Sequence, residues 1–194
     1  MTMTLILASA SPRRTALLDQ IGFVHQQMPV DIDESPRPGE SPQILVDRLA
    51  TQKATTAFEK LPAPIRQNGV VLASDTLIAF EGESLGKPAD ESDCMAMLKR
   101  LSGQTHQVLT AICVLNQTRR VTKTITTDVL FAPVTEAEIK TYWATGEPAD
   151  KAGSYAIQGI GGQFVKSVSG SVSAVIGLPL YETRCLLNEF GVYA

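Results

Sequence analysis

The sequence predicts an α/β fold, in which a mixed sheet is flanked by helices. Short apolar runs of strand length alternate with longer segments that carry helix-capping residues. Glycine-rich loops separate these segments, and two strand-length runs follow one another around a polar turn. Alternation of this kind favours α/β architecture. The length of 194 residues allows one domain, with room for two closely packed lobes.

The first third of the chain predicts a strand, two helices and a loop. Residues 5–8 form an apolar run that suits a buried strand. Ser11-Pro12 then provides a capping serine and a proline at the first helical position, and this helix should stop at Gly22. The stretch 28–39 is rich in proline and aspartate and is expected to be a loop. Ser41-Pro42 repeats the start signal for a second helix.

The middle of the chain predicts a strand, a hairpin and a capped helix. Residues 69–73 read as a buried strand that ends at Ser74-Asp75-Thr76. Residues 77–80 and the stretch after Glu81-Gly82 suggest a hairpin. Asp90 can cap a helix that ends at Leu101.

The last part predicts two strands, two helices and short segments between them. Residues 107–115 and 121–131 are the strand pair around a polar turn. Thr135 to Glu138 is a capping box that opens a helix ending near Gly146. Glycine-rich loops and short strands should follow, and residues 178–190 complete the chain with a helix.

The charge balance excludes a scaffold for nucleic-acid polymers. Seventeen Lys and Arg stand against 20 Asp and Glu, which gives a net charge of −3, so phosphate binding must come from a few placed cations. With 44% hydrophobic residues, residues 1–194 are expected to form one folded domain. No apolar run has bilayer length and Met1 to Ala10 lacks the basic residues of a signal peptide, so we expect no membrane partner and a cytoplasmic location.

Two scarce residue types restrict the chemistry. His25 and His106 are the only histidines, which leaves little room for a histidine zinc site or a histidine-based triad. Cys94, Cys113 and Cys185 form no CxxC pair and are expected to be free thiols. A metal, if used, should therefore be Mg²⁺ or Mn²⁺ held by carboxylates and phosphates.

Residues 9–14, Ser-Ala-Ser-Pro-Arg-Arg, are a candidate phosphate site. They place hydroxyls, Arg13 and Arg14 where a strand meets a helix N-terminus, which offers free N–H groups and a positive dipole. Guanidinium groups match phosphate oxygens in geometry. The alternative is an ordinary helix cap followed by two solvated arginines.

Asp75 follows a buried run, and open α/β sheets place ligands at the carboxyl ends of strands. A carboxylate in such a place needs a cation, a metal or several donors. The alternative is an aspartate that caps a turn.

Lys53 lies beside the apolar stripe of the second helix, and Lys87 sits in a stiff Gly-Lys-Pro loop; either lysine could also be solvated. The acidic loop with Glu34 could hold a hard cation or simply face water.

The segment 153–162 is rich in glycine but is neither a dinucleotide fingerprint nor a P-loop. Its glycines allow the backbone to approach a ligand closely. The amide of Gln158 can both donate and accept, as reading a base edge requires. A tight structural loop is the alternative.

Taken together, these segments resemble the Maf family of nucleoside-triphosphate pyrophosphatases over nearly the whole chain. The resemblance rests on eight blocks that occur in one order: 7–14, 33–34, 49–54, 73–76, 86–88, 101–103, 150–159 and 175–179.

The resemblance implies a cleft between two lobes in a fold similar to that of inosine-triphosphate pyrophosphatases. It implies hydrolysis of a nucleoside triphosphate to the monophosphate and pyrophosphate with a divalent cation, Mg²⁺ or Mn²⁺, and suggests a homodimer. By the same resemblance Asp75 matches the catalytic acid–base residue, the positions matched to substrate choice are Arg13, Thr76 and Gln158, and those matched to polar residues of the same cleft are Glu34, Lys53 and Lys87. From the residue types we expect Arg13, Arg14, Lys53 and Lys87 to hold the triphosphate, and Asp75 or Glu34 to hold the metal.

The block 152–159, Ala-Gly-Ser-Tyr-Ala-Ile-Gln-Gly, resembles the branch that prefers dTTP and UTP. A branch that prefers 7-methyl-GTP carries a glutamate near the position of Gln158 and a tryptophan in the first loop, where this chain has Arg13. An amide suits a neutral pyrimidine edge, whereas a cationic base favours a carboxylate. The alternatives are a modified-nucleotide pyrophosphatase and a non-catalytic, nucleotide-binding regulator of septum formation.

Overall fold

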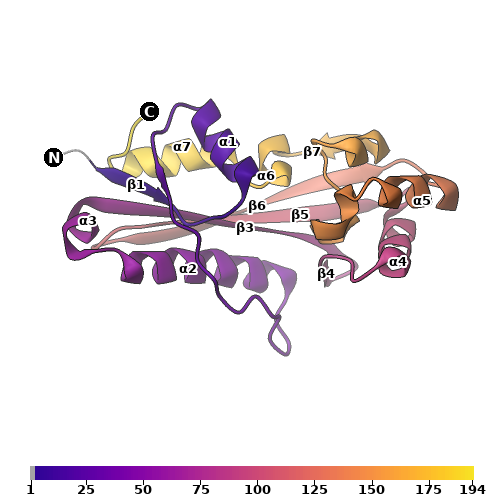
Figure 1. Cartoon of the computed structure of the whole chain (residues 1–194), viewed down its shortest axis with the longest axis horizontal. Helices are drawn as coiled ribbons and strands as arrows, with labels where there is room; N and C mark the ends of the chain where they lie inside the picture. Colours follow the sequence, from indigo (N-terminus) through magenta and orange to yellow (C-terminus); the bar gives the residue numbers. More distant parts are fainter. Residues whose placement is uncertain (1–2) are drawn as a thin grey trace.

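A computed structural model describes residues 3–194. Its centre is one mixed seven-stranded sheet, with the order β2-β1-β3-β5-β6-β7 and with β4 added to β3 (Figure 1). The strand β1 runs parallel to β2 and β3, and the remaining pairs are antiparallel. The strands are β1 (Thr4–Leu7), β2 (Gln26–Gln27), β3 (Gly69–Phe80), β4 (Glu83–Leu85), β5 (Thr105–Leu115), β6 (Arg120–Phe131) and β7 (Val165–Ser169).

Helices cover both faces of the sheet and gather at one end of it. They are α1 (Pro12–Gln20), α2 (Pro42–Lys60), α3 (Ala63–Asn68), α4 (Glu91–Leu101), α5 (Glu136–Ala144), α6 (Val172–Ile176) and α7 (Leu180–Glu189), with the 3₁₀ helices η1 (Glu147–Asp150), η2 (Ala152–Ser154) and η3 (Ile160–Phe164). The predicted mixed sheet flanked by helices is confirmed.

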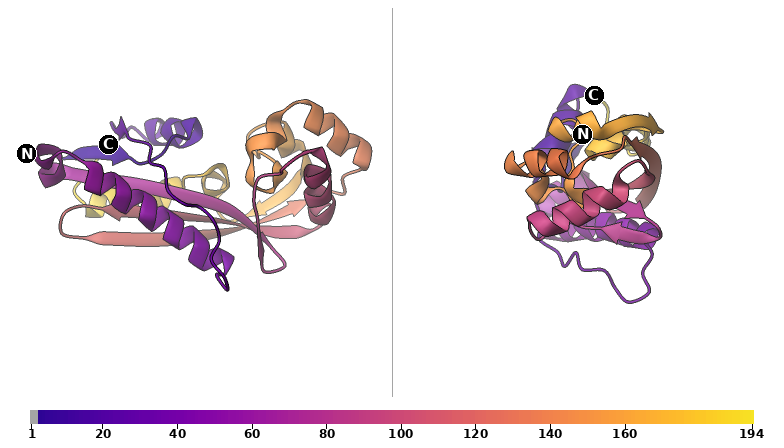
Figure 2. Two further views of the ribbon diagram at one scale, coloured as in Figure 1. Left: turned by 60° about the horizontal axis from the view of Figure 1, so that its bottom comes forward. Right: turned by 90° about the vertical axis from the view of Figure 1, so that its right-hand side faces the viewer.

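Two lobes share the three long strands β3, β5 and β6. The larger lobe contains β1, α1, α2 and α7, and the smaller lobe contains α4, α5 and the 3₁₀ helices, as the left view of Figure 2 shows. Within residues 3–194, no helix combines the length and apolar character that crossing a bilayer requires.

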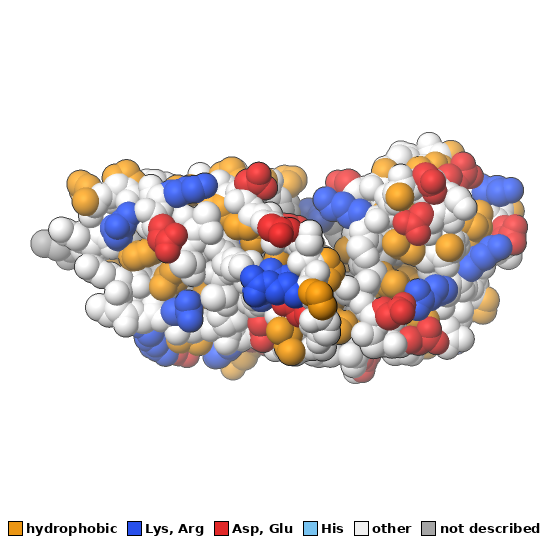
Figure 3. All heavy atoms as spheres, turned by 90° about the horizontal axis from the view of Figure 1, so that it is seen from below, with side chains coloured by type: hydrophobic (Ala, Val, Ile, Leu, Met, Phe, Trp, Pro, Cys, Tyr) orange, Lys and Arg blue, Asp and Glu red, His pale blue; other side chains and the backbone are white. Residues whose placement is uncertain are grey.

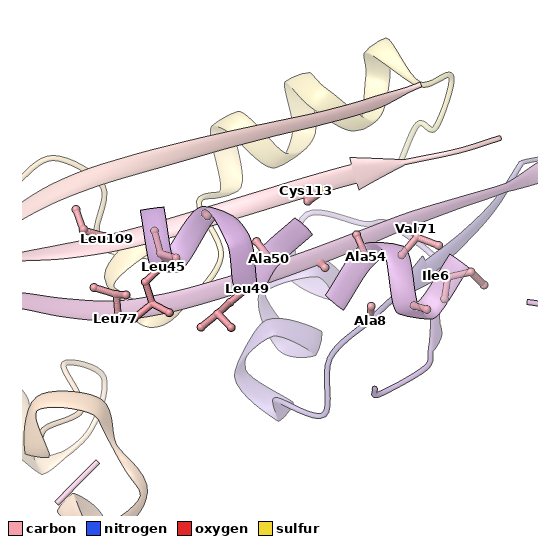
Figure 4. Close-up of a cluster of buried hydrophobic side chains, with 14 of the residues drawn as sticks. Ile6, Ala8, Leu45, Leu49, Ala50, Ala54, Val71, Leu77, Leu109 and Cys113 are labelled. Carbon is pink, nitrogen blue, oxygen red and sulfur yellow. The ribbon is translucent and has the colours of Figure 1, made fainter. Parts of the chain in front are cut away.

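The long helix α2 packs along one face of the sheet. Its buried side chains, which include Leu45, Leu49 and Ala54, recur at helical spacing and meet strand residues such as Val71 and Leu109 (Figure 4). Small alanines in the middle of the contact let the helix approach the strands closely. This packing fixes the position of Lys53, which belongs to the same helix.

Two other apolar clusters complete the core. On the opposite face of the sheet, α1 and α7 pack against β1 and β3 through residues such as Leu18, Leu72 and Leu187. In the smaller lobe, Leu98 of α4 and Ile139 of α5 pack against the far ends of the long strands. Each lobe therefore has its own apolar centre, and the shared strands connect them.

The capping residues act as the sequence predicts. The side chains of Ser11, Ser41 and Asp90 accept hydrogen bonds from backbone N–H groups in the first turns of α1, α2 and α4. Thr135 and Glu138 form the reciprocal capping box of α5. The hairpin turn at Glu81-Gly82 is also confirmed.

The prediction that a strand starting at Gly69 ends at Ser74–Thr76 is wrong. β3 continues to Phe80, and its residues at 74, 75 and 76 pair with β5 in the same antiparallel ladder. Their side chains are polar, as in a turn, but each has a partner inside the protein. Polar groups that are satisfied in this way can remain in a buried strand.

Candidate active site

The candidate site lies where two partners of β3 leave its edge uncovered. β1 pairs with Gly69–Leu72 and β4 with Ile78–Phe80, so neither covers residues 73–77 on that side. Asp75 is therefore in the middle of β3, but just beyond the carboxyl end of the parallel β1–β3 pair. The surface is hollowed between the lobes, with basic side chains beside the hollow (Figure 3).

Two adjoining cavities make up this cleft, and both lobes contribute to it. The first is lined by Ser11, Arg13, Arg14, Thr76, Ile78, Lys87, Val108, residues 150–152 and 155–158, Val175 and Ile176. The second is lined by residues 8–11, Arg14, Val30, Glu34, Lys53, Asp75 and Lys87. Ser11, Arg14 and Lys87 belong to both, so the two cavities meet at a basic waist. Every site residue predicted from the sequence lines one cavity or the other.

A buried lysine joins two carboxylates in the second cavity. The ammonium of Lys53 lies 2.7 Å from Oδ1 of Asp75 and 2.7 Å from Oε1 of Glu34. The side chains of Asp75 and Lys53 are only 10% and 12% exposed, whereas that of Glu34 is 59% exposed. Alternation along β3 turns Asp75 towards α2, which carries the lysine. The three groups come from a strand, a helix and a loop.

Burial raises the pKa of Asp75 above its usual value, while the ammonium of Lys53 and then the guanidinium of Arg14 oppose that shift. The negative charge of Glu34 adds to the rise. A carboxylate with a raised pKa is a better base than a solvated aspartate, and the lysine still favours its charged form. The arrangement suits a group that must take a proton from water.

Arg14 is held in place by the protein itself. Its Nε donates to the carbonyl of Gly177 at 2.9 Å, and its Nη2 donates to Oγ1 of Thr76 at 3.3 Å. Gly177 has φ 134°, which glycine adopts without strain, and its carbonyl also accepts from Ser74. Burial lowers the pKa of Arg14, against the pull of Asp75. The guanidinium is thus a pre-positioned cation at the waist of the cleft.

The hydroxyl of Thr76 has a defined direction. Oγ1 of Thr110 donates to the carbonyl of Ala174 at 2.7 Å, which uses its only proton. The contact of 3.0 Å between the two threonine hydroxyls must then have Thr76 as donor. Since Thr76 also accepts from Arg14, it can offer the cleft only an acceptor. This fixed polarity suits recognition of an N–H group on a ligand.

The other predicted residues lie around the entrance. Lys87 is exposed in the loop after β4, and Gly86 of that loop accepts a hydrogen bond from Gly153, so the loop is tied to the glycine-rich segment. Arg13 and Gln158 line the first cavity from opposite lobes. Gln158 is exposed, so its amide is accessible to a ligand.

Several residues of the cleft were not predicted individually. Ile78 and Val108 form an apolar floor, and Tyr155 lies beside them. Lys151 forms an ion pair with Asp150 at the rim, which the sequence does not distinguish from two solvated charges. The apolar residues gave no chemical signal, because in the sequence they are indistinguishable from other apolar residues of β3 and β5.

The residues present fit a divalent cation that also binds phosphate. One oxygen each of Asp75 and Glu34 lies next to the same positive group, the ammonium of Lys53. Carboxylate oxygens are the ligands that Mg²⁺ prefers. Among residues 3–194, no group of three or more His, Cys, Asp or Glu side chains is placed to hold a metal. Two carboxylates would therefore be completed by phosphate oxygens and water, the usual arrangement for Mg²⁺.

Comparisons with known proteins give one consistent result. A family model described as Maf-like protein matches residues 4–190. Relatives called dTTP/UTP pyrophosphatase come from Colwellia psychrerythraea (52% identity, 96% of this chain and 88% of the relative), Pseudoalteromonas atlantica (50%, 97% and 97%) and Shewanella oneidensis (47%, 98% and 100%). The solved structure of the Staphylococcus aureus Ham1 protein matches at 16% identity and a TM-score of 0.47, covering 66% of this chain and 72% of that chain, a likeness too weak to support a conclusion.

Proposed function

The chain belongs to the Maf family, and from this membership and the geometry of the cleft we propose that it hydrolyses dTTP and UTP to the monophosphate and pyrophosphate. Relatives called dTTP/UTP pyrophosphatase, at about half identity over nearly the whole chain, support the substrate. The observation that carries the mechanism is the buried Asp75–Lys53 pair beside a waist of basic side chains.

The triphosphate would lie across the waist of the cleft. Arg14 and Lys87 line both cavities, and Arg13 lines the first, so three cations can face one polyanion. A pre-positioned guanidinium loses little entropy on binding and matches phosphate oxygens. Lys53 is committed to the two carboxylates, and its charge contributes to the same field.

Asp75 and Glu34 would hold the divalent cation, Mg²⁺ or Mn²⁺. When bound, the metal neutralises phosphate charge and acidifies water. Asp75 would orient the attacking water and accept its proton. The water oxygen then bonds to the α-phosphorus, the bond from that phosphorus to the α–β bridging oxygen breaks, and pyrophosphate leaves. Positioning and charge neutralisation supply most of the catalysis in such reactions.

The first cavity would receive the base. Its floor is apolar, and the neutral polar groups in its lining include the acceptor of Thr76 and the amide of Gln158. Uracil and thymine present both donors and acceptors on their edges, which an acceptor and an amide can match. A neutral glutamine at this place supports pyrimidine substrates over the cationic base of 7-methyl-GTP.

A nucleotide panel tests the proposal. The purified chain is incubated with Mn²⁺ and with UTP, dTTP, CTP, GTP and 7-methyl-GTP in parallel, and pyrophosphate is measured. Multiple turnovers with highest kcat/KM for UTP and dTTP are expected. Highest kcat/KM for 7-methyl-GTP would place the chain in the other branch, and binding without turnover would favour the non-catalytic regulator.

Two further parts of the proposal are a homodimer, which rests on the family resemblance, and a cytoplasmic location, which stays an expectation from the sequence. Sedimentation equilibrium across a range of concentrations measures the mass directly, and a value twice the 20.9 kDa of one chain is expected. A mass of one chain at all concentrations would contradict the dimer.

A further inference from the structure

A single carboxylate holds the segment that carries Gln158. Glu147 begins η1, outside the cleft, and accepts two backbone hydrogen bonds from the segment that follows Gln158. Ile160 donates to its Oε1 at 2.9 Å, and Gly161 donates to its Oε2 at 2.9 Å. Hydrogen bonds to an ionised acceptor are among the stronger ones in proteins. The carboxylate therefore anchors the far side of this segment.

The buried phenol of Tyr142 anchors the near side. Its hydroxyl donates to Oε2 of Glu147 at 2.5 Å and accepts from the backbone N–H of Ala156 at 3.3 Å. Gln158 thus lies between two anchor points, two residues after one and two before the other. Neither Glu147 nor Tyr142 lines the cleft, whereas residues 155–158 do.

The glycines of the segment belong to this arrangement. A Cβ at position 159 would overlap the Glu147 carboxylate, and one at position 161 would lie 2.5 Å from the Tyr142 hydroxyl. Only glycine allows the backbone to approach these two groups so closely. The glycine-rich composition therefore reflects contact with Glu147 and Tyr142 as well as access to a ligand.

The negative charge of the Glu147 carboxylate keeps both of its oxygens available as hydrogen-bond acceptors. Burial raises the pKa of Glu147, but the hydrogen bonds from Tyr142, Gly161 and Ile160 outweigh that effect, so the pKa lies below its usual value. At neutral pH the side chain is therefore an acceptor only, which matches the three donors around it. A glutamine in its place would turn N–H donors towards one of those three donors.

We propose that Glu147, acting with Tyr142, is a positioning residue that fixes Gln158 at the cleft and thereby sets the selectivity for pyrimidine bases. The inference rests on the proposed function, since it concerns the same base cavity. It goes further by assigning selectivity to two side chains that do not line the cleft. Loosening residues 156–161 should widen the base cavity and weaken the contact of Gln158 with the pyrimidine edge. The side chains that bind the triphosphate should keep their positions.

The variant Glu147→Gln tests this with kinetics on UTP and GTP in the presence of Mn²⁺. We expect KM for UTP to rise about tenfold, as the loss of one or two hydrogen bonds to a charged group would give. The kcat for UTP should stay within about twofold and GTP should be little affected, so the UTP/GTP selectivity falls about tenfold. Glu136→Gln is the matched control, because that glutamate pairs only with Lys99 at the surface.

The outcomes separate the inference from the proposed function. If wild-type protein releases no pyrophosphate from any nucleotide, the proposed function fails. If wild-type protein is active and Glu147→Gln keeps its selectivity, or loses kcat equally on all nucleotides with unchanged KM, the inference is overturned. Tyr142→Phe, which keeps the ring, should show a smaller fall in selectivity and decides the matter if Glu147→Gln does not fold.

Hydrogen exchange provides a readout that does not depend on activity. The amides of Ile160 and Gly161 should exchange faster in Glu147→Gln than in the wild type, and no faster in Glu136→Gln. Unchanged protection of both amides would show that the carboxylate does not hold the segment, and would overturn the inference.

Discussion

At the scale of single residues, the site depends on a balance around Asp75. Burial raises the pKa of this carboxyl above its usual value, and the ammonium of Lys53 opposes that rise. The balance leaves a carboxyl whose pKa is raised, which makes it a better proton acceptor than a solvated aspartate, while Lys53 still favours its charged form. Glu34, which belongs to a loop, pairs with the same ammonium as Asp75, which belongs to β3.

The pH profile of Lys53→Met tests this balance. Removing the ammonium removes the main stabilisation of the charged Asp75, so its pKa should rise further. The acid limb of kcat/KM for UTP should then move to higher pH than in the wild type. An acid limb that stays in place or moves to lower pH would contradict the assigned coupling.

His106 gives a second residue-scale prediction, which concerns stability. Its ring is 1% exposed, its Nε2 lies 2.7 Å from the Tyr155 hydroxyl, and Phe131 packs on it edge-on at 5.0 Å. Burial lowers its pKa from 6.5 to about 4. Between these values the unfolded chain binds a proton that the folded chain does not, so stability should fall as pH drops from 6.5 towards 4.

Urea unfolding at pH 7 and pH 5 measures this contribution. The wild type should lose about 2 kcal/mol more between the two values than His106→Gln, since one pH unit below 6.5 corresponds to about 1.4 kcal/mol. Other titrating groups are common to both chains and cancel in the comparison. Equal pH dependence in the two proteins would show that His106 is not the neutral, buried group described.

Individual site residues could be predicted from the sequence better than their contacts. The carboxylate of Asp75 and the cations of Arg14 and Lys87 all lie at the cleft, and they were predictable because their residue types and the blocks around them indicate the chemistry. The anchoring role of Glu147 could not be predicted. It depends on a contact between segments more than ten residues apart, which no local pattern records.

At the scale of elements, the loop 28–41 brings Glu34 to the cleft. Arg48 of α2 holds this loop with a bidentate pair to Glu40, at 2.6 and 2.8 Å, and with a bond to the carbonyl of Ser35 at 3.0 Å. The Arg48 hydrogen bonds are the largest cause that lowers the pKa of Glu40, to about 2, so the pair persists in mild acid. Arg48 thus attaches the part of the loop that follows Glu34 in the sequence to α2.

The variant Glu40→Gln should loosen this loop. We expect the Mn²⁺ concentration for half-maximal activity to rise about threefold, because one charged hydrogen-bonding pair is lost, together with faster proteolytic cleavage within the loop. Glu59→Gln, an exposed change at the other end of α2, serves as the control. An unaltered Mn²⁺ dependence in Glu40→Gln would mean that the Arg48–Glu40 pair does not position Glu34.

The elements themselves follow closely from local patterns. Helix starts at Ser11, Ser41, Asp90 and Thr135 were predictable because capping depends on neighbouring residues alone. The continuation of β3 through Ser74–Thr76 was not, because it depends on distant partners such as Gly177. Local polarity favoured a turn there, and tertiary hydrogen bonds overrode it.

At the scale of the whole molecule, three continuous strands join the lobes. β3, β5 and β6 contribute to the apolar centres of both, so neither lobe has a sheet of its own. We therefore expect the chain to unfold in one cooperative step. In scanning calorimetry the calorimetric and van't Hoff enthalpies should agree, whereas two resolved transitions would show that the lobes unfold separately.

The division into lobes also explains why the cleft forms where it does. β1 is short and leaves β3 uncovered beyond Leu72, and β4 covers β3 again only from Ile78. In the proposed binding mode, the open edge lies between the half on the α1 side, which would face phosphate, and the half on the smaller lobe, which would face the base. Asp75 faces α2 and Thr76 faces the opposite side of the sheet, so the proposed substrate would reach both of them across this open edge.

The central claim is that Asp75 drives pyrophosphate release from a nucleoside triphosphate in this cleft. The most direct measurement compares kcat for UTP with Mn²⁺ in the wild type and in Asp75→Asn, with thermal unfolding to confirm that the variant is folded. A general base contributes about 10²- to 10⁴-fold, so kcat should fall at least about a hundredfold while the variant stays folded. Near wild-type turnover in a folded Asp75→Asn would contradict the account.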